Sequence, residues 1–262
     1  MKKPAFGALA AALAIVVSLA VLPAMPRGAA TAAEQIEIPS RNWSFEGIFG
    51  HYDRAAAQRG LQVYREVCSG CHSLEYIAFR NLVDLGYSEG DIRAFAAEAT
   101  ITDGPDDEGE MFEREGRPAD YFPSPFPNAQ AAAAANNGAA PPDLSLMVKA
   151  RVGGPNYLYA LLTGYEEPPA DFELLPGQNY NKVFPGHRIA MAQPLYDDSV
   201  TYADGTEATV EQQAHDLTVF LAWTAEPEME ARKRTGIKTI LFLLVLTGLL
   251  YAVKRKVWSD VH

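Results

Sequence analysis

Cysteine and positive charge are both scarce in this sequence of 262 residues. Its two cysteines are too few for a tetrahedral zinc site built from two cysteine pairs. Lysine and arginine number 22 against 33 aspartate and glutamate residues, which gives a formal net charge of -11 at pH 7. A surface of this sign repels nucleic acid and attracts cations, so we expect no nucleic-acid partner.

Both cysteines lie in one short motif, Cys-Ser-Gly-Cys-His, that ends at His72. Two cysteines with two residues between them and a histidine directly after the second are the attachment signature of a c-type haem. The motif predicts one haem c bound covalently through Cys68 and Cys71, with His72 as an iron ligand. A redox dithiol, half of a zinc site and a structural disulfide are the alternatives. The dithiol lacks the alternating strand and helix pattern that surrounds such motifs, and the zinc site lacks a second cysteine pair.

The amino-terminal residues 1–33 predict a secretory signal peptide. Lys2 and Lys3 precede a long apolar run, and small residues lead to a cleavage point before Glu34. An uncleaved membrane anchor is the alternative. Export would bring the chain to the compartment in which haem is attached covalently and in which spare cysteines would oxidise.

A second apolar run, residues 235–253, lies near the carboxyl end and contains one charged residue, Lys238. At about 1.5 Å per residue a helix over this run is roughly 28 Å long, close to the thickness of the bilayer core. We therefore predict a transmembrane anchor with basic flanks at 232–256 and a cytoplasmic tail at 257–262. Export of the amino terminus would place a haem domain, residues 34–231, on the periplasmic side of the bacterial inner membrane as part of a single-pass protein.

The expected fold is mainly α, a class I c-type cytochrome core with long loop insertions. Small c-type cytochromes cross an early and a late helix beside the haem, and helical spacing of apolar residues predicts such helices over 49–67 and 210–224. Thr209 and Gln212 form a potential capping box for the late helix.

Further helices are expected from Leu144 to Ala150 and over 157–162, with Pro142 or Asp143 at the start of the first. Three stretches between the helices are expected to be irregular surface insertions. They are the acidic segment 102–110, the proline-rich segment 121–127 and the alanine-rich segment 129–135.

The sixth iron position needs a second ligand, which is usually methionine or histidine. Met191 lies in a loop after a Pro-Gly turn, between the small residues Ala190 and Ala192, which would let the backbone approach the haem. A thioether ligand stabilises ferrous iron and raises the reduction potential. His187 is the nearest competing ligand, and an open site is the third alternative.

Motifs along the chain from Trp43 to Ser259 resemble the cytochrome c1 family, the haem subunits of the ubiquinol-cytochrome c reductase (cytochrome bc1) complex, in a bacterial form. The motifs are CSGCHS, ANNGAAPPDLSLMVKAR, LLTGYEEPP, NYNKVFPG, RIAMAQPL and TAEPEMEARKRTG. The resemblance implies that Met191 is the sixth ligand. It also implies that Arg151 and Tyr157 lie near the haem propionates, where a cation offsets a partly buried negative charge. Asn136 and Pro142 match positions that line the haem pocket.

The sequence departs from the family pattern at two places. The family's RHGG is RVGG here, and its YCEPP is YEEPP. Glu166 therefore replaces a cysteine, so a disulfide that some bacterial members form there is absent. Neither change affects a predicted iron ligand.

The resemblance also implies the partners. The chain would accept one electron from a Rieske iron-sulfur protein and pass it to cytochrome c, while its anchor in the lipid bilayer packs against cytochrome b in a dimeric complex. Electron transfer needs no catalytic acid or base, and none is expected. A tethered shuttle c-type cytochrome and a peroxidase-type haem enzyme with a displaceable sixth ligand are the alternative functions.

Clustered acidic residues suggest where a basic cytochrome c would dock. The cluster at 103–110 is the leading candidate, because the insertion is long and strongly acidic. Smaller groups in other loops are Glu166 with Glu167, and Asp197 with Asp198. The alternative is that these residues only keep the surface solvated.

Overall fold

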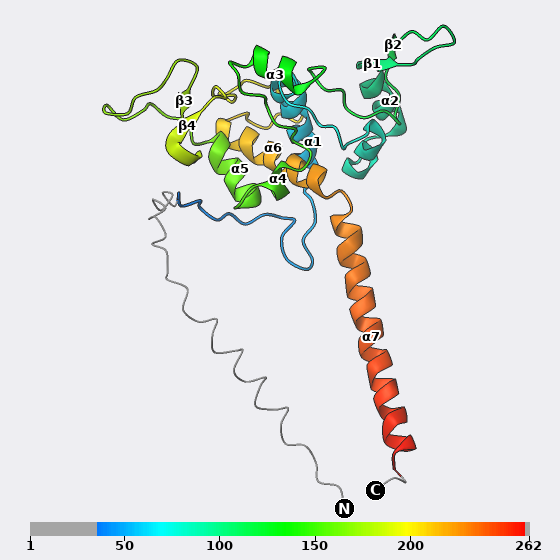
Figure 1. The fold of residues 1–262 in the computed structure, drawn as a ribbon. Coiled ribbons are helices and arrows are strands. Elements are labelled where there is room, and N and C mark those ends of the chain that lie inside the picture. Colours follow the sequence, from blue (N-terminus) through cyan, green and yellow to red (C-terminus); the bar gives the residue numbers. More distant parts are fainter. Residues whose placement is uncertain (1–35, 260–262) are drawn as a thin grey trace, which may run out of the picture. The chain divides into compact units, whose positions relative to one another are not determined.

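A computed structural model describes residues 36–259 of the chain, so the signal-peptide prediction for 1–33 lies outside the described residues. The described part is mainly helical, which confirms the predicted fold class (Figure 1). The α-helices are α1 (Arg54–Val63), α2 (Glu89–Ala97), α3 (Ala129–Ala135), α4 (Met147–Ala150), α5 (Gly154–Leu162), α6 (Val210–Ala225) and α7 (Met229–Val257). The strands form two short antiparallel ribbons, β1 (Thr100–Asp103) with β2 (Phe112–Glu115) and β3 (Asn179–Tyr180) with β4 (Arg188–Ile189).

Helix α1 begins later than predicted, because Asp53 caps it: the Asp53 carboxylate accepts a hydrogen bond from the Ala56 N–H at 3.1 Å. Residues 49–52, which were expected to be helical, belong to the preceding loop. At its other end α1 continues without a break as one turn of π-helix, Tyr64–Cys68. Such turns are rare and occur often at functional sites. The helix thus delivers the chain directly to the first cysteine.

Helix α6 begins where it was predicted. The Thr209 hydroxyl accepts a hydrogen bond from the Gln212 N–H at 3.2 Å, which confirms Thr209 as the N-cap. The reciprocal half of the predicted capping box is wrong, since the Gln212 side chain donates to the carboxylate of Asp216 instead. Nearly all side chains from Gln213 to Ala225 are buried, so α6 is the central helix of the core rather than a helix with one apolar face.

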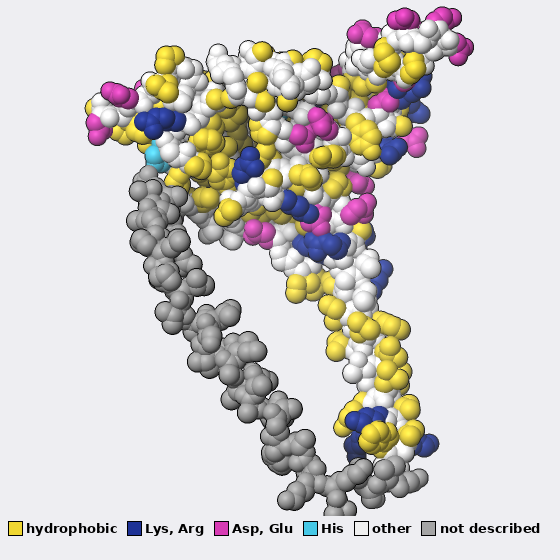
Figure 2. Space-filling model, in the orientation of Figure 1, with side chains coloured by type: hydrophobic (Ala, Val, Ile, Leu, Met, Phe, Trp, Pro, Cys, Tyr) yellow, Lys and Arg dark blue, Asp and Glu magenta, His cyan; other side chains and the backbone are white. Residues whose placement is uncertain are grey.

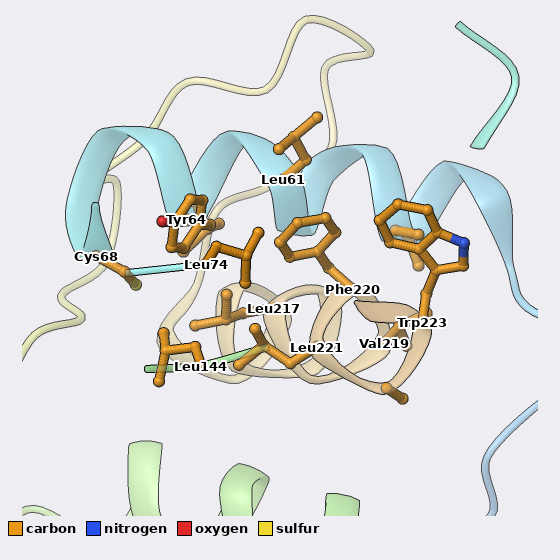
Figure 3. Packing of buried hydrophobic residues seen from close by; sticks show 14 of the residues in the cluster. Leu61, Tyr64, Cys68, Leu74, Leu144, Leu217, Val219, Phe220, Leu221 and Trp223 are labelled. Carbon is orange, nitrogen blue, oxygen red and sulfur yellow. The ribbon is translucent and has the colours of Figure 1, made fainter. Parts of the chain in front are cut away.

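Helices α1 and α6 cross at Gly60, where their backbones touch. A Cβ at Gly60 would lie 2.1 Å from the Asp216 carbonyl oxygen, so only glycine fits this crossing. Figure 3 shows apolar side chains of α1 and α6 packed together beside it, among them Leu61 and Phe220.

A buried ion pair joins the same two helices. The Arg59 guanidinium donates to both carboxylate oxygens of Asp216, at 2.7 and 3.1 Å, and Asp216 is fully buried. Burial disfavours the charged carboxylate, but hydrogen bonds from His215, Arg59 and Gln212 outweigh it and lower the pKa of Asp216. The charge therefore persists inside the core and ties α6 to α1.

Helices α4 and α5 lie in the region where helices were expected, with shifted ends. The first was predicted to start at 144 but starts at Met147, and the second was predicted to start at 157 but starts at Gly154. Gly153 separates them with a φ of 88°, a left-handed conformation that favours glycine. Pro155 in the first turn of α5 suits a helix start, because proline has no N–H to leave unpaired there.

Two of the stretches expected to be irregular contain regular structure. The acidic segment 102–110 includes the end of β1 and the loop of the β1–β2 hairpin, in which Thr100 pairs with Glu115. The alanine-rich segment 129–135 is helix α3, which the Asn128 side chain caps by accepting from the Ala131 N–H at 2.8 Å. Pairing across the hairpin and the high helix propensity of alanine account for both differences.

Helix α7 contains the predicted anchor and starts three residues before it. By length and composition it could cross a membrane, and most of its large apolar residues from Ile240 onward are exposed. Its first turn packs on the haem domain instead. Met229 is buried in the core, and Glu230 forms an ion pair with Arg54 at 3.1 Å.

Gly60→Ala should destabilise the domain by about 1–3 kcal/mol, because the added methyl group would push the crossing helices apart. Thermal unfolding followed by circular dichroism would measure the loss. Gly90→Ala is the matched control: Gly90 lies in α2, and a Cβ there would meet only the Ser88 hydroxyl at an ordinary 3.5 Å. Equal melting temperatures for the two variants would contradict a close crossing at Gly60.

Candidate haem site

The attachment motif folds into one tight turn at the end of the π-helix. The N–H groups of Cys71 and His72 both donate to the Cys68 carbonyl oxygen, at 3.1 and 2.9 Å. Cys68 is buried and Cys71 is exposed, and both are free thiols rather than a disulfide. Burial, with a smaller effect from Cys71, raises the pKa of the Cys68 thiol to about 12. The turn therefore holds two thiols and one imidazole side by side.

His72 has a fixed tautomer. Its Nδ1 lies 2.8 Å from the carbonyl oxygen of Pro142, and a carbonyl can only accept a hydrogen bond, so Nδ1 carries the proton and donates. This leaves the lone pair of Nε2 for a metal. Burial lowers the pKa of His72, against opposing effects of the Pro142 hydrogen bond and the Asp143 charge. The ring is thus neutral at pH 7, which is the state in which imidazole binds iron.

The Asp143 side chain connects the segment that follows His72 to the segment that contains Pro142. One carboxylate oxygen accepts from the Ser73 hydroxyl at 2.9 Å and the Glu75 N–H at 2.8 Å. The other accepts from the Ser145 N–H at 2.8 Å. The prediction that this residue starts a helix is wrong, because α4 begins only at Met147. Its side chain instead fixes the position of the carbonyl that orients His72.

Tyr64 also supports the turn and was not identified from the sequence. Its hydroxyl donates to the His72 carbonyl oxygen at 3.1 Å, and the ring is buried between Phe122 and Phe220. The sequence gives one hint of this role. Tyr64 precedes Cys68 by four positions, and residues with that spacing lie on one face of a helix.

Met191 lies in the loop after β4 and is partly buried. The Tyr165 hydroxyl donates to the Met191 carbonyl oxygen at 3.1 Å, which holds this loop against the end of α5. His187, the competing ligand, has its Nδ1 3.2 Å from the Asn181 carbonyl oxygen, and its ring stacks on Tyr180 at 5.5 Å. Because the Nδ1 of His72 is bonded to a carbonyl in the same way, these contacts do not choose between the two ligands. Ligation by Met191 remains a prediction.

Three further predicted site residues, Tyr157, Arg151 and Asn136, lie on or next to helices α5, α4 and α3. Tyr157 is buried on α5, and burial raises its pKa while the nearby charge of Arg151 lowers it. Arg151 follows α4 and is exposed, with one guanidinium nitrogen donating to the Ala150 carbonyl oxygen at 3.2 Å. Asn136 ends α3 and donates to a carbonyl of that helix. Arg151 is therefore free to reach an anionic group beside Tyr157.

Figure 2 shows a hollow with a hydrophobic wall on the face that carries α3, α5 and the β3–β4 ribbon in Figure 1. A porphyrin is a flat apolar ring with two anionic edges. The described residues supply a group for each chemical part of haem c. These are an apolar hollow, two thiols on one turn, a neutral imidazole and an arginine near Tyr157. The described residues therefore fit the predicted cofactor.

Known proteins resemble this chain over most of its length. The model of the Cytochrome C1 family matches residues 43–261. Cytochrome b/c1 of Bradyrhizobium diazoefficiens is 54% identical over 246 residues, which is 86% of this chain and 36% of that protein. This chain thus spans about a third of that relative.

Two further relatives match over most of their own length. Cytochrome c1 of Rhodospirillum rubrum is 51% identical over 251 residues, 89% of this chain and 92% of that protein. The mitochondrial heme protein cytochrome c1 of Saccharomyces cerevisiae is 51% identical over 235 residues, 89% of this chain and 76% of that protein.

Asp143→Asn should raise the midpoint potential of the haem while leaving it covalently attached. The substitution removes a negative charge close to His72 and weakens the hydrogen bonds that hold the Pro142 carbonyl, and both changes disfavour ferric iron. Redox potentiometry would measure the shift. Glu75→Gln, which removes an exposed neighbouring charge, should shift the potential less. Equal shifts would mean that Asp143 acts only through its charge, and an unchanged potential would contradict the role assigned to it.

Proposed function

This chain belongs to the cytochrome c1 family, and we propose that it is the haem-bearing electron-transfer subunit of a cytochrome bc1 complex. The observation that carries the proposal is the attachment turn, in which the Pro142 carbonyl sets the tautomer of His72. Haem c, when bound, supplies one-electron chemistry without transfer of atoms. The protein accordingly needs no catalytic acid or base of its own.

The residues of the site have different roles in binding the haem. Cys68 and Cys71 form the thioether bonds, and His72 ligates iron through Nε2. Met191 supplies the sixth ligand from the loop that Tyr165 holds. Arg151 and Tyr157 bind the propionates, while Asn136 and Pro142 line the pocket. A methionine on the second side closes the iron to other ligands, which favours electron transfer over peroxidase chemistry.

The partners follow from membership in the complex. A Rieske iron-sulfur protein donates the electron, a cytochrome c accepts it, and α7 packs against cytochrome b in the bilayer of a dimeric assembly. The names of the relatives, which include a cytochrome b/c1, support the association with cytochrome b.

The haem domain lies on the periplasmic side of the bacterial inner membrane, held by α7 as a single membrane-spanning helix. Its length and apolar composition support the span. Basic residues flank the apolar run on both sides, so the orientation rests on export of the amino terminus rather than on the distribution of charge.

The acidic loop between α5 and β3 is the docking face for the acceptor. Tyr165 at its start bonds to Met191, and the Glu173 carbonyl accepts from the Arg188 side chain at 3.2 Å, so this loop borders the haem hollow. The β1–β2 hairpin, with the acidic cluster 103–110, lies across the domain from the β3–β4 ribbon (Figure 1). Its position favours the α5–β3 loop over the hairpin, because the acceptor must approach the haem edge closely.

Met191→Leu should keep the haem attached while lowering its midpoint potential by a large part of the roughly 0.8 V range that axial ligands command. Loss of the ferric absorption band near 695 nm, the usual mark of methionine ligation, should accompany the shift. Met147→Leu is the matched control, since Met147 is buried in α4 and packs in the core. The ligand assignment fails if the two variants have the same potential.

Neutralising the α5–β3 loop should slow reduction of a basic cytochrome c and flatten its dependence on salt. Steering by such charges acts over a screening length of about 8 Å at physiological salt. The test variant carries Glu166→Gln, Glu167→Gln, Asp171→Asn and Glu173→Gln, and stopped-flow mixing at several ionic strengths gives the rate.

A second quadruple variant changes the net charge equally at the hairpin. It carries Asp106→Asn, Asp107→Asn, Glu108→Gln and Glu110→Gln, and should react nearly as the wild type does. A larger effect at the hairpin would restore the cluster 103–110 as the docking face. Equal effects would show that only the overall charge matters.

A further inference from the structure

The loop between Trp43 and Tyr52 carries two large apolar side chains into solvent. Ile48 is 69% exposed and Phe49 is 83% exposed, whereas Trp43, Phe45 and Tyr52 are buried in the core. An exposed apolar tip on a loop whose two ends are fixed in the core indicates an interaction site.

The backbone of this loop has a defined shape. Gly47 has a φ of 72°, and the His51 N–H donates to the Ser44 carbonyl oxygen at 2.9 Å. A Cβ at Gly50 would lie 2.0 Å from the Glu46 carbonyl oxygen, so the chain folds back tightly on itself there. The two apolar side chains are therefore presented by a closed turn.

The loop is bound to the first turns of α7. The Lys233 ammonium donates to the carbonyl oxygens of Phe45 and Gly50, at 2.7 and 3.2 Å. The Tyr52 N–H donates to the Glu230 carboxylate at 2.9 Å. Both ends of the turn thus move with the helix.

These contacts set the level of the loop relative to the bilayer. Ile237 is the first large apolar residue of the run 235–253. Lys233 lies four residues before it, a distance of about 6 Å along a helix. The headgroup layer on each side of a bilayer is about 5–8 Å thick. In Figure 1 the loop reaches down beside the first turns of α7, and Figure 2 shows a hydrophobic patch at the same place.

We propose that Ile48 and Phe49 form a second contact with the membrane by inserting into the lipid headgroup region beside α7. The proposal rests on α7 crossing the bilayer, which is part of the proposed function. Apolar side chains gain from leaving water at this depth, and the exposed Arg234 on the neighbouring helix suits lipid phosphates. Two contacts would restrict the tilt and rotation of the haem domain, which a single helix leaves free.

Spin labels on single introduced cysteines test the proposal in the full haem-loaded chain, incorporated into phospholipid nanodiscs. The haem occupies Cys68 and Cys71, so each introduced cysteine is the one free thiol. Labels at Phe49→Cys and Val245→Cys probe the loop and the middle of α7. A label at Met111→Cys, which is 60% exposed on the hairpin, is the aqueous control.

Electron paramagnetic resonance should show that the label at residue 49 collides more with oxygen, and less with a polar nickel reagent, than the label at residue 111. Adding Lys233→Ala should shift the label at residue 49 toward the aqueous values, because the loop loses its bond to α7. Aqueous values at residue 49 with lipid values at residue 245 would overturn the loop proposal alone. Aqueous values at residue 245 would overturn the membrane anchor as well.

Discussion

The crossing of α1 on α6 is the contact on which the rest of the haem domain depends. Gly60 lets the two backbones touch, and the Arg59–Asp216 ion pair locks them at that point. Removing one partner of a buried ion pair costs about 3–5 kcal/mol, so the pair tolerates little change. Because α1 continues into the turn at Cys68, the crossing also decides where the attachment site lies relative to the core.

The site is held by a second layer of hydrogen bonds between segments that are far apart in the chain. Pro142 and Asp143 meet the turn at His72 across about seventy residues of sequence. The Pro142 contact is made at Nδ1 and not at Nε2, the predicted iron-binding atom, yet it sets the tautomer and orientation of the ring. Such outer contacts orient the ligands of a metal site and tune its affinity and activity.

The junction between the haem domain and α7 is rigid where it could have been a flexible linker. Met229 is buried, Glu230 bonds to Arg54 and Tyr52, and Lys233 holds the loop of Ile48 and Phe49. A domain fixed in this way keeps its haem at a set height above the membrane. That constraint suits the proposed transfer from a donor beside the membrane to an acceptor in solution.

The sequence alone determined the features that depend on local spacing. Cys68, Cys71 and His72 were predicted because haem chemistry dictates their separation, and the apolar run of α7 and the Thr209 cap of α6 follow from helical geometry. Only the tertiary structure decided the features that need distant segments to meet. The role of Asp143 differs from the expectation because its carboxylate bonds to Ser73 and Glu75, about seventy residues away. The start of α1 at Arg54 and the β1–β2 hairpin also differ, but for local reasons, which are the Asp53 cap and the pairing of consecutive strands. The position of the acidic loops is of the same kind, because charge is read from composition but its distance from the haem hollow exists only in the folded chain.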